Sequence, residues 1–147
     1  MNAYNQAERL IEIIENAGGE DLFAYKDGVL SSTVHTGKTI EAFDLRIEFP
    51  HDTVLITTRS FLGVEEHNYD RMRVLLESLN ELVNNGIFFI DEDNTISFLT
   101  ICEFEDIIRA CNPFDIVFSG CEPFGVFSEA ILKTLAGNHV YYVNNLM

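Results

Sequence analysis

The chain has 147 residues, of which 47% are hydrophobic and 22% are charged. This length predicts a single domain, residues 1–147, with a sizeable core, and the balance is that of a globular protein rather than a disordered one. The 24 acidic and 9 basic residues give a net charge of −15, which argues against binding to nucleic acids or to anionic membranes. The charge suits a basic protein partner or, more simply, solubility.

The three cysteines, Cys102, Cys111 and Cys121, are an odd set without Cys-x-x-Cys spacing. Unpaired and mostly buried thiols in a reducing cytoplasm are the simplest interpretation. The beginning of the sequence lacks the charged and then apolar pattern of a signal peptide, and the apolar runs are shorter than the ~18 residues of a membrane span. We therefore expect a cytoplasmic protein.

The first elements expected are one helix and two short strands. Apolar residues recur at helical spacing in residues 3–17, and Gly18-Gly19 then ends the helix. Strands are expected at residues 22–25 and 29–35. Asp27-Gly28 joins them as a two-residue turn, because both of its positions tolerate a positive φ.

The strongest pattern is that of four further strands. Apolar and charged residues alternate in 42–49, which indicates a strand with one dry and one wet face, and the β-branched segment 53–62 is the next strand. Residues 87–90 and 95–102 flank the acidic turn 91–94 and predict a hairpin.

Two helices complete the predicted fold. The first covers residues 69–83, with Asn68 as N-cap and Asn84-Asn85-Gly86 at its end, and 103–111 is a mixed connection. Asn112-Pro113 begins the second, a long helix kinked at Pro123 and in phase as far as Gly137; two shorter helices broken at 120–123 are the alternative. The elements predict an α+β fold: helix, twisted antiparallel sheet of about five strands, helix, hairpin, long C-terminal helix, and the tail 138–147.

No pattern predicts a catalytic, cofactor or metal site. An EF-hand loop that began at Asp91 would need Gly and Glu where the sequence has Ile96 and Cys102. Cys111, near a predicted helix start, is the one thiol that we would test for reactivity. The histidines lie in four separate segments without metal-ligand spacing: His35, His51, His67 and His139.

Three aromatic residues are candidate partner or dimer contacts. Phe127 lies off the main apolar stripe of the last helix, where it either meets a partner or covers the edge of the core. Tyr141 and Tyr142 lie in a β-prone tail that could pair with a sheet edge or with a second chain.

Segments 43–50, 79–82 and 86–93, together with the end of the last helix, resemble the YbjN domain family, whose members are often labelled bacterial sensory transduction regulators. The resemblance implies a fold like that of the type III secretion chaperones, a twisted antiparallel sheet with helices packed on it. Those chaperones are small, acidic and often dimeric, and they wrap a non-globular segment of a client. The family brings no catalytic residues, and the chain departs from its pattern in 104–127.

We therefore expect a non-enzymatic binding protein or chaperone-like regulator, a homodimer without a cofactor, whose protein partner offers a basic or non-globular segment. One alternative is an enzyme or small-molecule sensor with a pocket between sheet and helices, to which His51, Arg59 and Cys111 could contribute. The other is an inhibitor or immunity-type protein that uses its negative surface against a basic target.

Overall fold

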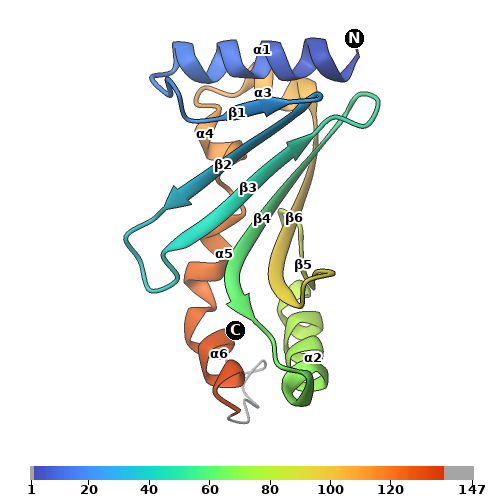
Figure 1. Cartoon of the computed structure of the whole chain (residues 1–147), viewed down its shortest axis with the longest axis vertical. Coiled ribbons are helices and arrows are strands. Elements are labelled where there is room, and N and C mark those ends of the chain that lie inside the picture. The colour runs from blue at the N-terminus through green and yellow to red at the C-terminus, as the bar shows by residue number, and fades with distance from the viewer. Residues whose placement is uncertain (1, 138–147) are drawn as a thin grey trace.

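The computed structural model, which describes residues 2–137, is an antiparallel sheet with helices against one of its faces (Figure 1). The strands follow the order β1-β2-β3-β4-β6-β5. This confirms the α+β class, although about five strands were expected and the described residues form six. The strands are β1 (Ala24–Lys26), β2 (Val29–His35), β3 (Ala42–Glu48), β4 (Thr53–Gly63), β5 (Ile87–Ile90) and β6 (Thr95–Glu103).

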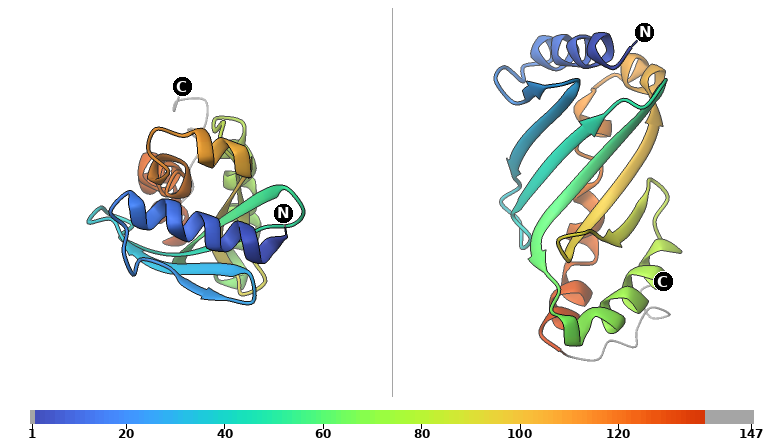
Figure 2. Two further views of the ribbon diagram at one scale, coloured as in Figure 1. Left: turned by 90° about the horizontal axis from the view of Figure 1, so that it is seen from above. Right: turned by 45° about the vertical axis from the view of Figure 1, so that its right-hand side comes forward.

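The helices are unevenly placed around the sheet. Seen from above, α2 and the C-terminal helices lie on one side of it, and α1 crosses one end (Figure 2). The opposite face of the sheet carries no described helix. The helices are α1 (Ala3–Asn16), the 3-10 turn η1 (Glu66–Asn68), α2 (Tyr69–Asn80), α3 (Phe104–Arg109), α4 (Phe114–Val117), α5 (Cys121–Val126) and α6 (Ser128–Leu135).

The core lies between the sheet and the helices and consists of two clusters of buried side chains. In the first, which includes residues of α2, α5 and α6, the ring of Phe88 meets those of Phe98 and Phe124 at centroid distances of 4.9 and 5.2 Å. In the second, Leu10 and Ile14 of α1 join residues of α3, α4 and the other end of the sheet. Strand alternation supplies both clusters from the same strands.

Two turns that contain glycine form as the sequence predicts. At the end of α1, Gly18 has a φ of +98°; its N–H donates to the Glu15 carbonyl oxygen at 3.0 Å, and the Gly19 N–H donates to that of Ile14 at 2.9 Å. This pair of hydrogen bonds closes a helix when the residue after the C-cap adopts a left-handed backbone conformation. Asp27-Gly28, with φ values of 53° and 79°, turns β1 into β2.

Both ends of α2 differ from the prediction. Asn68 stands at the N-cap position but makes no capping hydrogen bond; its Nδ2 donates to the Leu135 carbonyl oxygen at the end of α6, at 3.2 Å. The helix ends at Asn80, three residues before the predicted Val83. Gly86 is not its cap, since Glu81 stands at the C-cap position. A Cβ at Gly86 would collide with the Leu99 carbonyl oxygen. This glycine allows the chain to approach β6 closely.

The side chain of Asn80 hydrogen-bonds to the free edge of β5. Its Oδ1 accepts from the Phe88 N–H at 2.6 Å, and its Nδ2 donates to the Phe88 carbonyl oxygen at 3.0 Å. Strand β6 pairs with the other edge of β5. The amide therefore occupies both main-chain groups of Phe88 that point away from the sheet.

The connection after β6 contains a helix that the sequence did not predict. Asp106 in α3 accepts a hydrogen bond from the Glu103 N–H at 3.0 Å, which supports its first turn. The next helix begins one residue later than predicted, with Pro113 at the N-cap position of α4. The side chain of Asn112 accepts from the Phe114 N–H at 3.0 Å.

The prediction of one long C-terminal helix is wrong, because the structure has three short helices there: α4, α5 and α6. The first break comes at Gly120, near the predicted alternative, where a Cβ would collide with the side chain of Thr58 on β4. Pro123 lies in the first turn of α5, where a missing N–H costs little. A second break comes at Phe127, whose backbone (φ −107°, ψ 19°) leaves the helical region.

Candidate functional site: the open face of the sheet

The face of the sheet that carries no described helix is the candidate site, and we call it the open face. Side chains alternate along each strand, so Phe43, Leu45 and Ile47 of β3 enter the core. The residues between them lie on the open face: Asp44 is half-buried there and Arg46 is exposed. The register carries this alternation across the sheet.

One half of the open face, over β4, β6 and β5, presents apolar side chains. Leu55 lies opposite Ile101 across the β4–β6 pair, and Leu99 lies opposite Ile87 across the β6–β5 pair. Ile101 is 60% exposed and Ile87 is 49% exposed. Directly opposed side chains on one face lie close enough to touch, so these residues and Phe89 form a continuous surface. We call it the apolar band: Leu55, Ile87, Phe89, Leu99 and Ile101.

The other half, over β1 to β3, is polar and concave. A hollow of about 830 Å³ lies there, and Lys26, Arg46 and Arg59 are among the residues that line it. Arg46 Nε lies 3.2 Å from a Glu48 carboxylate oxygen. Lys26 has no ion pair within 4 Å among residues 2–137. This half therefore offers polar contacts beside the band.

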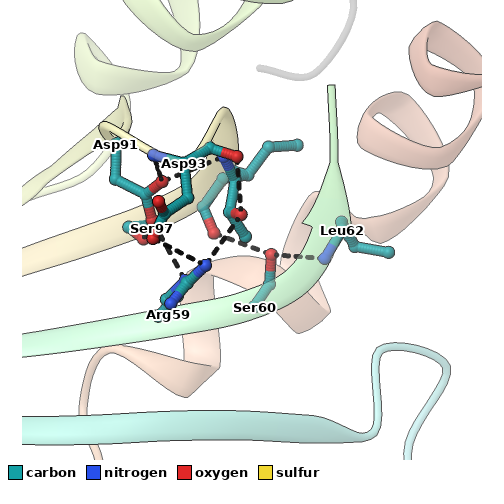
Figure 3. A network of polar contacts seen from close by, with 8 residues as sticks. Arg59, Ser60, Leu62, Asp91, Asp93 and Ser97 are labelled. Atoms are coloured by element: carbon teal, nitrogen blue, oxygen red, sulfur yellow. Dashed lines mark hydrogen bonds and ion pairs between the residues drawn. The ribbon is translucent and has the colours of Figure 1, made fainter. Parts of the chain in front are cut away.

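Arg59 holds the acidic turn after β5 against β4 (Figure 3). Its guanidinium lies 3.3 Å from Asp91 and 3.1 Å from Asp93, and it donates to the Thr95 hydroxyl at 3.3 Å. The Ser97 hydroxyl donates to Asp91 at 2.9 Å. The acidic turn of the sequence thus neutralises an arginine and fixes the β5–β6 hairpin to the centre of the sheet.

Strand β4 is irregular beside this network. Arg59 pairs with Ser97 and Gly63 pairs with Thr95, so β4 has two extra residues between these pairs. Ser60 supports the irregularity, because its hydroxyl donates to the Ile96 carbonyl oxygen at 2.7 Å and accepts from the Leu62 N–H at 3.2 Å (Figure 3). Such a bulge increases the local twist and bends the strand.

Charged side chains of both signs lie on the open face. The strands place three basic and three acidic residues on this face. Asp91 and Asp93 beside Arg59, and Asp21 and Asp27 in the hollow, make its charge acidic. The charged residues that the strands contribute to the face are Lys26, Arg46, Arg59, Asp44, Glu48 and Glu103.

Of the predicted contact residues, Phe127 does not lie on the open face. Phe127 is only 9% exposed and belongs to the first core cluster, as the core alternative expected. Tyr141 and Tyr142 lie outside the described residues. The three residues proposed to line a pocket do not converge: His51 precedes the first residue of β4, and Arg59 lies about 26 Å along the chain from it. Cys111, between α3 and α4, is nearer the His51 end.

The thiols differ in environment. Burial, with a smaller contribution from Asp106, raises the pKa of the half-buried Cys102 to about 11. Burial also raises the pKa of Cys121 to about 11, against the opposing effect of Lys38. Cys111 is exposed, and all three thiols are free. Exposure distinguishes Cys111 as the accessible thiol of the three.

Sequence reasoning missed the apolar band, although a signal was present. Strand 87–90 is apolar at every position, and Leu99 and Ile101 are apolar in the phase of β6 that the core does not use. An apolar residue in the outward phase points to contact with something beyond the chain's own core.

No family model and no curated protein matches the chain. Within residues 2–137, no group of three or more His, Cys, Asp or Glu side chains is arranged to hold a metal ion. The helices of this part are too short or too polar to cross a membrane. The candidate site rests on the shape, apolarity and charge of the open face.

Proposed function

We propose that the chain is a non-enzymatic protein-binding domain, chaperone-like or regulatory, and that it binds through the open face of its sheet. The observation that carries this proposal is the apolar band, which runs across three strands and includes Ile87 and Ile101, each about half exposed. Soluble domains rarely leave adjoining apolar side chains in water unless something covers them.

The band is suited to binding because it is rigid before a partner arrives. Its residues stand on paired strands in fixed register, and the Arg59 network fastens the β5–β6 hairpin to β4. A rigid surface loses little conformational entropy when it is covered. Covering the exposed part of each isoleucine contributes about 1 kcal/mol by the usual area relation.

The resemblance of 43–50, 79–82 and 86–93 to the YbjN domain family supports the chaperone-like form of the proposal. A twisted sheet with helices on one face is the arrangement that the resemblance implies. The partner that we infer is a non-globular segment with apolar side chains, which meets the band while its polar groups meet the concave half. We place the protein in the cytoplasm.

Capture of partners with purified bait proteins tests the proposal. Three baits are compared: the unaltered chain, Ile101→Lys in the band, and Val126→Lys, which makes the same change at a 66% exposed position on α5. We expect the first and third baits to enrich the same partner at least tenfold over Ile101→Lys, measured by quantitative mass spectrometry. Equal enrichment by all three baits, or no partner beside turnover of a metabolite, would refute it.

A further inference from the structure

We propose that Asn85 is a site of spontaneous covalent modification, at which the side-chain amide cyclises onto the main-chain nitrogen of Gly86 and water then converts the imide into aspartate or isoaspartate. The co-reactant is water, and the products add one negative charge to the chain. The inference goes beyond the proposed function and does not rest on it, because it concerns a chemical change in the chain itself.

The two residues lie in the irregular link between α2 and β5, where the attacking nitrogen is available. Residues 83–86 belong to no helix or strand, and within residues 2–137 none of their main-chain N–H groups donates a hydrogen bond. The peptide group between Asn85 and Gly86 can therefore turn without breaking a hydrogen bond of its N–H. Glycine also carries no side chain beside the nitrogen.

The Asn85 side chain is held by one contact, which does not protect the carbon under attack. Its Nδ2 donates to the Ser119 carbonyl oxygen, in the link between α4 and α5, at 3.2 Å. Asn85 is exposed, so water competes for this hydrogen bond and reaches the amide. The bond engages the nitrogen that leaves, whereas Gly86 attacks Cγ.

The neighbouring asparagines lack one or more of these conditions. Asn85 is the one asparagine of the sequence that is followed by glycine. Asn84 is followed by Asn85, whose side chain crowds the attacking nitrogen. Asn80 lies in α2, and both atoms of its amide group are engaged by the main chain of Phe88. The chemistry is therefore specific to one position.

The reaction is a substitution followed by a hydrolysis, without a change of oxidation state. The Gly86 nitrogen gives up its proton and attacks Asn85 Cγ, so a C–N bond forms; the bond from Cγ to Nδ2 breaks, and ammonia leaves with a proton. Water then opens the five-membered imide. Cleavage of the new bond gives aspartate, and cleavage of the original peptide bond gives isoaspartate, in which the main chain runs through Cγ.

Aspartate at position 85 reverses the polarity of the contact with Ser119. A carboxylate, which only accepts hydrogen bonds, then faces a carbonyl oxygen that also only accepts. The next residue, Gly120, packs closely against Thr58 of β4. We therefore expect the modification to weaken the attachment of the α4–α5 link to the start of β5.

Isoaspartate has a second effect, because it adds one atom to the main chain directly before β5. A Cβ at Gly86 would already collide with the Leu99 carbonyl oxygen, so the inserted atom must displace the chain. The next residue, Ile87, pairs with Leu99 and belongs to the apolar band. Register in a sheet is set by such pairs, so the isoaspartate form presents an altered open face.

Mass spectrometry of the intact full chain, with assay of isoaspartate, follows the reaction during incubation at mildly alkaline pH. We compare the unaltered chain with Asn85→Gln, whose longer side chain disfavours the imide, and with the control Asn84→Gln. The unaltered chain and the control should gain one dalton at the same rate, and Asn85→Gln at least tenfold more slowly. Equal rates in all three would overturn the proposal. A folded chain that stays unchanged, whether or not the urea-unfolded chain reacts, would overturn it as well.

Two comparisons test the structural consequences. Asn85→Asp should lower the midpoint of urea denaturation relative to Asn84→Asp, which adds the same charge one residue earlier. The isoaspartate form, separated by ion exchange, should exchange the amide hydrogens of residues 87–90 at least tenfold faster than the fresh chain. Equal midpoints would refute the role of the Ser119 contact, and unchanged exchange would refute the displacement of β5.

Discussion

The three thiols show how one residue type meets three environments along a chain. Cys102 points from β6 toward the second core cluster, Cys121 opens α5 beside the first, and Cys111 is exposed between helices. The pKa of each half-buried thiol is raised to about 11, because burial disfavours the charged form. At pH 8, about one in a thousand of each is thiolate.

We predict that one thiol reacts fast and two react slowly when the folded protein is mixed with excess 5,5′-dithiobis(2-nitrobenzoate) at pH 8. The fast phase belongs to Cys111, and Cys111→Ser should remove it, whereas Cys121→Ser should leave it. The slow phases should accelerate about tenfold for each unit of pH, because the thiolate fraction rises in that proportion below a pKa of about 11. Retention of the fast phase in Cys111→Ser would contradict the assignment.

Single residues were predictable from sequence where their role is local. The Asp27-Gly28 turn requires only two positive φ angles, and Asp and Gly are residue types that tolerate them. Asn68 was predicted as a cap, but its side chain reaches Leu135, 67 residues away in the chain. The ion pair between Arg59 of β4 and Asp91 of the β5–β6 turn was equally impossible to predict from local sequence patterns. Contacts of this range depend on the assembled fold.

At the scale of elements, the C-terminal region shows where periodicity misleads. The apolar stripe of residues 114–135 keeps helical phase, but phase does not record how near another element lies. Gly120 is buried against Thr58 of β4, and the helix breaks there. The sequence shows a glycine at this position, but the reason that no larger residue fits is visible only once the helix packs on the sheet. Strands were better predicted because alternation reports burial directly.

Gly120 and Gly125 form a matched pair that tests this account. We expect Gly120→Ala to lower the free energy of unfolding by about 1–3 kcal/mol, because the new methyl group meets Thr58. Gly125→Ala adds the same methyl in open space on α5 and should raise it by about 0.5–1 kcal/mol through helix propensity. Urea denaturation followed by circular dichroism measures both. Equal effects would show that contact with the sheet does not matter.

For the whole molecule, the two core clusters share the central strands. Phe43 of β3 belongs to the first cluster and Leu45 of the same strand to the second. Two buried residues, Thr58 on β4 and Thr100 on β6, separate the apolar residues of the clusters on the inner face. Alternation in the sequence predicted the buried face of β3, but the division of the core depends on which helix covers which end.

We predict one cooperative unfolding transition, because strands continuous through both clusters couple them. Leu10→Ala in the second cluster and Leu79→Ala in the first should each cost about 2–5 kcal/mol, since both side chains are fully buried. In the double variant the costs should add within about 0.5 kcal/mol, because the sites share no cluster. Chemical denaturation followed by circular dichroism and by tyrosine fluorescence checks this. Separate midpoints for the two probes would mean that the clusters unfold independently.

The Asn80 contact with β5 has a consequence for how the chain folds in a crowded solution. An uncharged edge strand of sequence Ile-Phe-Phe-Ile is a template for aggregation whenever its main-chain groups are free. Asn80 lies only eight residues before Phe88, so the contact closes by a short loop that forms far faster than encounters between molecules. The most hazardous edge of the protein can therefore be blocked early, by its own neighbouring helix, before the distant strands of the sheet have assembled.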